Sequence, residues 1–188
     1  MLRWLLPLVL TLATGNVSAA TLQVSGGILT GAKGVDVGGT LYDVEFKDGS
    51  CVSLFGPCTG TMDFAFTSSS TAFQAAQALL DQVLLNQYDI QPELTRGCGD
   101  SALCQIWTPF TEVPGSVTVA FAENGAGAGN NQAIIANEDP NFDSSASTQV
   151  TYAVWSNAAQ VPEPSSVALL SAGLLAFAAS RCQRPTQK

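Results

Sequence analysis

Residues 71–90, "TAFQAAQALLDQVLLNQYDI", carry the clearest periodic pattern of this 188-residue chain. Apolar side chains recur there at steps of three and four residues, which places them on one face of a helix. Alanine, glutamine and leucine also favour the helical conformation. A serine or threonine at 68–71 can cap the start, and Pro92 limits the end. We therefore expect one main helix over about residues 70–88, with its apolar face packed on the core.

Short segments of strand-forming residues lie on both sides of this helix. Two precede it, at 40–47 and 60–70, and in the second Met62, Phe64 and Phe66 alternate as residues on one face of a strand do. Four follow it, at 102–110, 115–124, 132–137 and 147–157, separated by turn-forming residues. The glycine-rich residues 21–39 predict one short strand followed by a loop.

Connections between these segments decide the expected fold class. Most of the strands are joined by short turns, and such connections favour antiparallel pairing. No internal repeat is present, which argues against a β-solenoid. The sequence therefore predicts an α+β domain, in which an antiparallel sheet of about five to seven strands is covered on one face by the main helix.

Charge is distributed unevenly along the chain. All fifteen acidic residues lie between Asp36 and Glu163, and only three basic residues lie between the two apolar ends of the chain, which gives this part a net charge near −12. A domain this acidic repels nucleic acid and anionic lipid. We expect a soluble domain that does not bind nucleic acid.

Four cysteines lie in the acidic part of the chain, and three pairings of them are possible. We favour Cys51–Cys58 and Cys98–Cys104, because each pair closes a short loop that contains turn residues. A zinc site is the alternative, but it needs tighter cysteine spacing and usually histidine, and the chain has no histidine. We therefore expect two disulfides and no metal or cofactor.

The N-terminal residues 1–20, "MLRWLLPLVLTLATGNVSAA", are arranged as in a secretory signal peptide. Arg3 provides the positive charge, residues 4–12 provide the apolar core, and small residues ending at Ala19 or Ala20 provide the cleavage site. An uncleaved anchor or a buried helix is the alternative, which Pro7 and the short apolar core disfavour. We expect a signal helix that is removed during export.

Residues 161–184, "VPEPSSVALLSAGLLAFAASRCQR", combine three elements. A Pro-Glu-Pro element comes first, then fourteen uncharged residues at 167–180, then two arginines. As a helix, fourteen residues span about 21 Å, which is less than the roughly 30 Å of a bilayer's hydrocarbon core. The arginines agree with the positive-inside rule. We expect a C-terminal apolar helix that is a poor permanent anchor.

This tail resembles the PEP-CTERM sorting signal of Gram-negative bacteria. The same motif is also labelled as the C-terminal domain of ice-binding proteins, a label that is no evidence for ice binding. The resemblance rests on about 24 residues, those of 161–184 quoted above. The residues that carry it are Val161, Pro162, Glu163, Pro164, Arg181 and Arg184.

The resemblance implies a route and a set of partners. Such proteins use the export machinery, are held transiently in the inner membrane by the tail, and are processed near the Pro-Glu-Pro by an exosortase. They are then released or attached to the cell surface or extracellular matrix, often together with exopolysaccharide. The implied domains are a signal peptide at 1–20, an exported α+β domain at 21–160, and the sorting signal at 161–188.

Catalytic constellations are sparse in the exported domain. Without histidine, Ser-His-Asp and Cys-His arrangements are impossible. Asp43 and Glu45 share one face of a strand and are candidates for a carboxylate pair, although a solvated strand face is the commoner role. The segment 137–143 offers oxygen ligands for calcium. These ligands would be Asn137, Glu138, Asp139, Asn141 and Asp143. The favoured interpretation is an acidic turn that binds no ion.

The exported domain is therefore expected not to be an enzyme. Two alternatives stay open. One is a small secreted carbohydrate-active enzyme that uses acidic residues. The other is a module that binds polysaccharide or ice. A cleft holding a carboxyl group of raised pKa would favour the enzyme, and a closed domain would favour a structural role.

Overall fold

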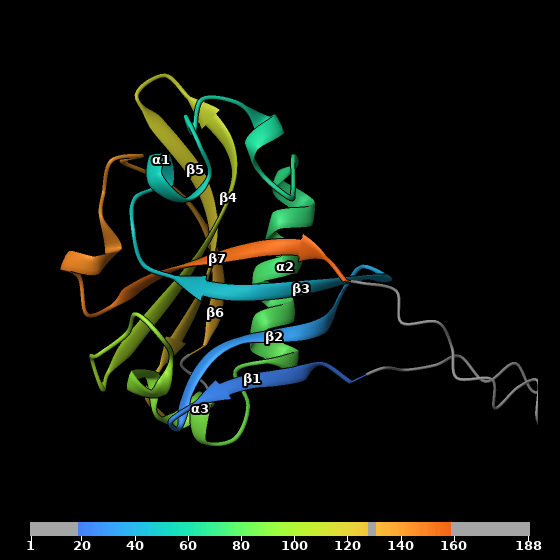
Figure 1. Cartoon of the computed structure of the whole chain (residues 1–188), viewed down its shortest axis with the longest axis vertical. Helices are drawn as coiled ribbons and strands as arrows, with labels where there is room; N and C mark the ends of the chain where they lie inside the picture. Colours follow the sequence, from blue (N-terminus) through green and yellow to red (C-terminus); the bar gives the residue numbers. More distant parts are fainter. Residues whose placement is uncertain (1–18, 128–130, 159–188) are drawn as a thin grey trace, which may run out of the picture. The chain divides into compact units, whose positions relative to one another are not determined.

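The computed structural model of the chain describes residues 19–127 and 131–158, which form a sheet with one long helix against it (Figure 1). The strands are β1 (Thr21–Ser25), β2 (Ile28–Val37), β3 (Thr40–Lys47), β4 (Leu103–Val113), β5 (Ser116–Gly125), β6 (Gln132–Glu138) and β7 (Val150–Asn157). The helices are α1 (Cys51–Leu54), α2 (Ser69–Gln82) and α3 (Gln87–Ile90), with 3-10 turns η1 (Thr61–Asp63), η2 (Pro92–Leu94) and η3 (Ser144–Ala146).

The predicted signal helix and the predicted C-terminal apolar helix lie outside the described residues. Within 19–127 and 131–158, no helix has both the length and the apolar character needed to cross a membrane.

The sheet consists of two three-stranded meanders joined by the last strand. Its order is β1-β2-β3-β7-β4-β5-β6. β7 is antiparallel to β3 but parallel to β4. The predicted antiparallel sheet and α+β class are therefore wrong, because the sheet is mixed and the fold is mainly β. Short turns reveal which strands pair within each meander, but β7 pairs with strands that are distant in sequence.

Both faces of the sheet are buried, by two separate hydrophobic clusters. We call the one under α2 the helix-side core; it includes Leu29, Val35, Phe46, Leu79 and Ile106. We call the other the outer cluster; it consists of Cys51, Cys58, Phe64, Trp107, Val117, Val119, Phe121, Val150 and Tyr152. Successive residues of a strand point to opposite faces, so β4 sends Ile106 to the first cluster and Trp107 to the second.

Small residues let α2 approach the sheet closely. Ala72, Ala75 and Ala76 are fully buried, and the helix lies against β2, β4, β5 and β6 (Figure 1). The Ser68 side chain accepts a hydrogen bond from the Thr71 backbone N–H at 3.2 Å and so caps the start.

α2 ends at Gln82, six residues before the predicted end. Asn86 adopts φ 57° and ψ −120°, a backbone conformation that a helix does not contain. Val83 and Leu84 are nevertheless buried, which is why the apolar period continues past the helix. The Gln82 side chain bonds both the backbone N–H and the carbonyl of Asp36, at 2.9 and 2.8 Å, and ties this end to β2.

The strand predicted at 60–70 is absent. The segment forms η1 and then crosses from the outer face of the sheet to the helix side. Phe64 therefore belongs to the outer cluster and Phe66 to the helix-side core, while Met62 is 94% exposed. The strict alternation of these residues does not correspond to one shared face.

The glycine-rich residues 21–39 form two strands, where one strand and a loop were predicted. Gly26 and Gly27, both with positive φ, make the turn between β1 and β2. Gly31 allows β2 to pack directly on β3, because a Cβ there would collide with the carbonyl oxygen of Val44. Glycine therefore has two roles in this segment: it forms the turn, and it allows the backbones of β2 and β3 to approach closely.

Two disulfides join Cys51 to Cys58 and Cys98 to Cys104, which confirms the pairs favoured from their spacing. All four cysteines are buried. The first disulfide closes the segment that covers the outer face, and the second lies at the start of β4.

A buried side-chain hydrogen bond joins β7 to β4. The Trp155 indole N–H donates to the Thr108 hydroxyl at 3.0 Å, and the two side chains are 8% and 1% exposed. We expect Thr108→Val to lower the free energy of unfolding by about 1–3 kcal/mol in urea denaturation, because the indole N–H loses its only partner. Thr108→Ser retains the hydroxyl and should cost less. Equal losses in the two variants would contradict this role of the bond.

Each disulfide is expected to contribute similarly to stability, because the two span sequence separations of 7 and 6 residues. Loop-closure entropy predicts a loss of roughly 2–3 kcal/mol for Cys51→Ala/Cys58→Ala and about the same for Cys98→Ala/Cys104→Ala. Urea denaturation of both double variants would measure this. Free thiols in the non-reduced protein, seen by mass spectrometry, would refute the pairing.

Candidate functional site

A pocket of about 300 Å³ opens beside the central strand β7. Its walls come from β7, from β4, from α1 and from the segment around η1. The lining residues are Leu54, Phe55, Asp63, Ala65, Phe66, Pro109, Ala153, Val154 and Trp155.

The pocket exists because β4 and β7 separate. Their parallel pairing covers only Gln105↔Val150, Ile106↔Thr151 and Trp107↔Tyr152. Pro109 follows, which has no backbone N–H to donate, and the register of β4 shifts between Pro109 and Thr111. Beyond Trp107 and Tyr152 the two strands therefore leave a wedge between them.

The pocket runs along the edge of β7. Ala153, Val154 and Trp155 are consecutive, and side chains of consecutive strand residues point to opposite faces. All three line the pocket, so it passes beside the strand rather than over one face. Beyond Tyr152 the edge of β7 that faces the pocket has no strand partner among the described residues, and the edge of a strand carries alternate N–H and carbonyl groups.

Three of the nine lining residues are aromatic, namely Phe55, Phe66 and Trp155. Phe66 and Trp155 pack edge to face, with ring centroids 5.5 Å apart. Phe55 packs in the same way against Phe64 and Tyr152, at 5.8 and 5.9 Å. Because each ring is held by another ring, and Trp155 also by its bond to Thr108, the walls are fixed before any ligand arrives.

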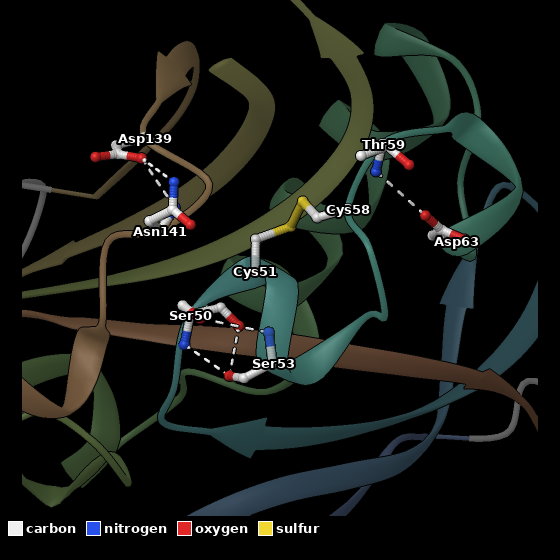
Figure 2. The surroundings of a disulfide bond; sticks show 8 residues. All are labelled: Ser50, Cys51, Ser53, Cys58, Thr59, Asp63, Asp139 and Asn141. Atoms are coloured by element: carbon white, nitrogen blue, oxygen red, sulfur yellow. Dashed lines mark hydrogen bonds between the residues drawn. A yellow bond between two sulfur atoms is a disulfide. The ribbon is translucent and has the colours of Figure 1, made fainter. Parts of the chain in front are cut away.

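The Cys51–Cys58 disulfide positions the outer wall (Figure 2). α1 begins at Cys51 and is capped by reciprocal bonds between Ser50 and Ser53. Leu54 and the following Phe55 are thereby placed at the pocket.

Asp63 is the charged residue of the lining, and none of the nine lining residues is basic. Its carboxylate accepts the Thr59 backbone N–H at 3.3 Å, as Figure 2 shows. This bond anchors the side chain at the end of η1, so a negative charge stands beside the aromatic wall.

The candidate carboxylate pair lies elsewhere. Asp43 accepts a bond from the Gly34 backbone N–H at 3.0 Å. Glu45 forms an ion pair with Lys47 at 2.6 Å, and the hydrogen bond from Lys47 lowers the pKa of Glu45. Neither carboxylate lines the pocket, and both serve contacts within β2 and β3.

In the acidic segment 137–143, two carboxylates already accept hydrogen bonds from backbone N–H groups of nearby turns. Asp139 accepts from the Asn141 backbone N–H at 2.9 Å, and Asp143 accepts from that of Ser145 at 3.0 Å. The bonds from Ser145 lower the pKa of Asp143. In the part of the chain that the structure describes, no group of three or more acidic or cysteine side chains is arranged to hold a metal ion.

Comparison with known proteins identifies the tail. The family model of the PEP-CTERM protein-sorting motif matches residues 160–181. This chain carries a PEP-CTERM sorting motif. The motif is a C-terminal sorting signal of exported proteins that an exosortase processes. Among curated proteins and solved structures, nothing matches the chain.

The PEP-CTERM motif follows the folded domain almost directly. Its match includes Val161, the Pro-Glu-Pro and Arg181, whereas Arg184 lies three residues beyond it. These residues lie outside the described part of the chain. The last described residue, Ala158, still donates a backbone hydrogen bond to the Leu41 carbonyl at 3.1 Å.

The pocket itself was missed by sequence analysis, which placed Phe64 and Phe66 on one strand face. One signal for it was present. A proline inside a strand pattern indicates an edge or a bulge, and Pro109 stands in the middle of the β4 pattern. It marks where β4 stops pairing with β7.

Among the described residues, Glu138 is the carboxyl group whose pKa is raised, by burial, and it does not line the pocket. Burial, followed by the charge of Glu138, also raises the pKa of Tyr152 in the outer cluster. An enzyme that uses acidic residues was expected to have a cleft that holds a carboxyl group of raised pKa. Glu138 does not meet this criterion, because it lies outside the pocket.

The raised pKa of Glu138 predicts a pH-dependent stability. A carboxyl group with a higher pKa in the folded state binds its proton more tightly there than in the unfolded state. Protonation therefore stabilises the fold at a pH below the unfolded pKa, and this stabilisation is lost as the pH rises through the folded pKa. Glu138→Gln should therefore be more stable than the natural protein near pH 7, and the difference should vanish near about pH 3. Denaturant melts at both pH values test this, with exposed Glu112→Gln as the control. A Glu138→Gln protein that is less stable at neutral pH would contradict it.

Proposed function

We propose that this chain is a non-enzymatic protein of the cell surface or extracellular matrix of a Gram-negative bacterium. The observation that carries the proposal is the PEP-CTERM motif at residues 160–181. The two buried disulfides support it, because such bonds persist in oxidising compartments outside the cytoplasm.

The proposed route uses both ends of the chain. Signal peptidase removes the signal peptide at residues 1–20 by cutting after Ala19 or Ala20. The tail then holds the protein in the inner membrane for a short time. An exosortase then acts near Pro162-Glu163-Pro164. Proline has a fixed φ and disfavours helix in the residue before it, so the sequence of this element disfavours helix.

The position of the chain ends supports this route. β1 begins and β7 ends at the same end of the sheet (Figure 1). A domain whose two ends leave at the same end of the sheet can be held at one membrane surface by either of them. A chain of the length from Ala158 to Pro162 spans at most about 14 Å when fully extended.

A role without catalysis fits the side chains of the pocket. Carboxylate-based hydrolysis of glycosides requires two acidic groups across the scissile bond, and the pocket lining provides Asp63 alone. The acidic domain also disfavours nucleic acid as a partner. Exopolysaccharide is the matrix partner that the sorting motif suggests.

Two variants separate membrane retention from processing. Deleting residues 161–188 should release the protein into the medium, because both the apolar run and the processing site are lost. Pro162→Ala/Pro164→Ala keeps the apolar run and should accumulate as a membrane-bound, unprocessed form. Fractionation followed by intact-mass analysis measures both. Unchanged fractionation of the deletion variant would refute the sorting role, and normal processing of the proline variant would refute recognition of the Pro-Glu-Pro.

A further inference from the structure

The pocket beside β7 has an electrostatic preference. Asp63 contributes a negative charge and no lining residue contributes a positive one. The surrounding domain adds to this preference, because residues 21–160 carry a net charge near −11. A strongly negative surface raises the local concentration of cations and lowers that of anions. The pocket therefore favours a positively charged ligand over a phosphate, sulfate or carboxylate.

The aromatic wall strengthens that preference. The face of an aromatic ring carries partial negative charge and attracts a cation placed within about 6 Å of its centre. Phe55, Phe66 and Trp155 all line the pocket. The Trp155 indole N–H is already bonded to Thr108, so this donor is not free for a ligand.

The exposed edge of β7 provides the remaining polar groups. Beyond Tyr152 the strand has no partner on the β4 side. Carbonyl oxygens along such an edge accept hydrogen bonds, and an ammonium group is a pure donor. An ammonium ion can thus bond backbone carbonyls while its charge is balanced by Asp63.

Size and chemistry narrow the ligand further. A volume of about 300 Å³ is at the small end of ligand pockets. A sugar unit presents many hydroxyl groups that need several polar side chains, and here eight of the nine lining side chains are apolar. A compact cation with an apolar body matches the lining better.

We propose that the pocket beside β7 binds a small organic ammonium ion, with Asp63 as the counter-charge and the aromatic side chains as the wall. This inference goes beyond the proposed sorting role and does not rest on it. The chain would then be a receptor for an amine, whichever surface it is delivered to.

A matched pair of probes tests the charge preference. Benzylammonium and benzyl alcohol have the same ring and similar size but differ in charge. Titration of the exported, oxidised protein, followed by ligand-observed NMR or calorimetry, should give an affinity for benzylammonium that is about tenfold higher. Equal affinities, or binding of glucose without binding of benzylammonium, would overturn the proposal.

Three variants assign the binding to this pocket. Asp63→Asn retains an acceptor for the Thr59 N–H and should remove the tenfold preference. Glu112→Gln removes one negative charge from an exposed position outside the pocket and should leave the preference unchanged. Ala65→Leu adds bulk at an exposed lining residue and should weaken both probes. Circular dichroism verifies that each variant is folded. A folded Asp63→Asn protein that keeps the preference, or a natural protein that binds neither probe, would also overturn the proposal.

Discussion

The pairing of β7 with both β3 and β4 is the interaction on which this fold depends. It joins two meanders that otherwise have no strand contact with each other. It also links the two hydrophobic clusters, since Tyr152 enters the outer cluster while its neighbour Ala153 enters the helix-side core. Because a strand that is buried on both faces must be apolar on both, β7 has little freedom in sequence.

The same pairing explains why the domain has a pocket at its centre. Parallel contact with β4 lasts for three residue pairs and stops before Pro109. The wedge that results is walled by a segment that folds back over the sheet and is held there by the Cys51–Cys58 disulfide. A discontinuity in the sheet and a covalent crosslink thus combine to form a preorganised site, in which ring packing fixes the walls.

Local patterns in the sequence predict local features well and non-local ones poorly. The disulfide pairs follow from short spacing, and the strands after residue 102 follow from β-propensity between turns. The central position of β7 does not, because no local signal specifies a partner more than 100 residues away, such as Lys47 for Tyr152. Phe64 and Phe66 show the same limit for the site: their alternation is real, but the disulfide-held segment sends them to opposite faces of the sheet.

The place of β7 in the sheet also sets the order in which the domain can assemble. The chain is synthesised from its N-terminal end, so both meanders exist before the strand that joins them. Neither β3 nor β4 can pair with β7 until residues 150–157 have been made, and the sorting motif begins three residues after Asn157. Pairing over such sequence distances is slow compared with hairpin formation. The sheet therefore cannot be completed until the chain has been made almost as far as the sorting motif.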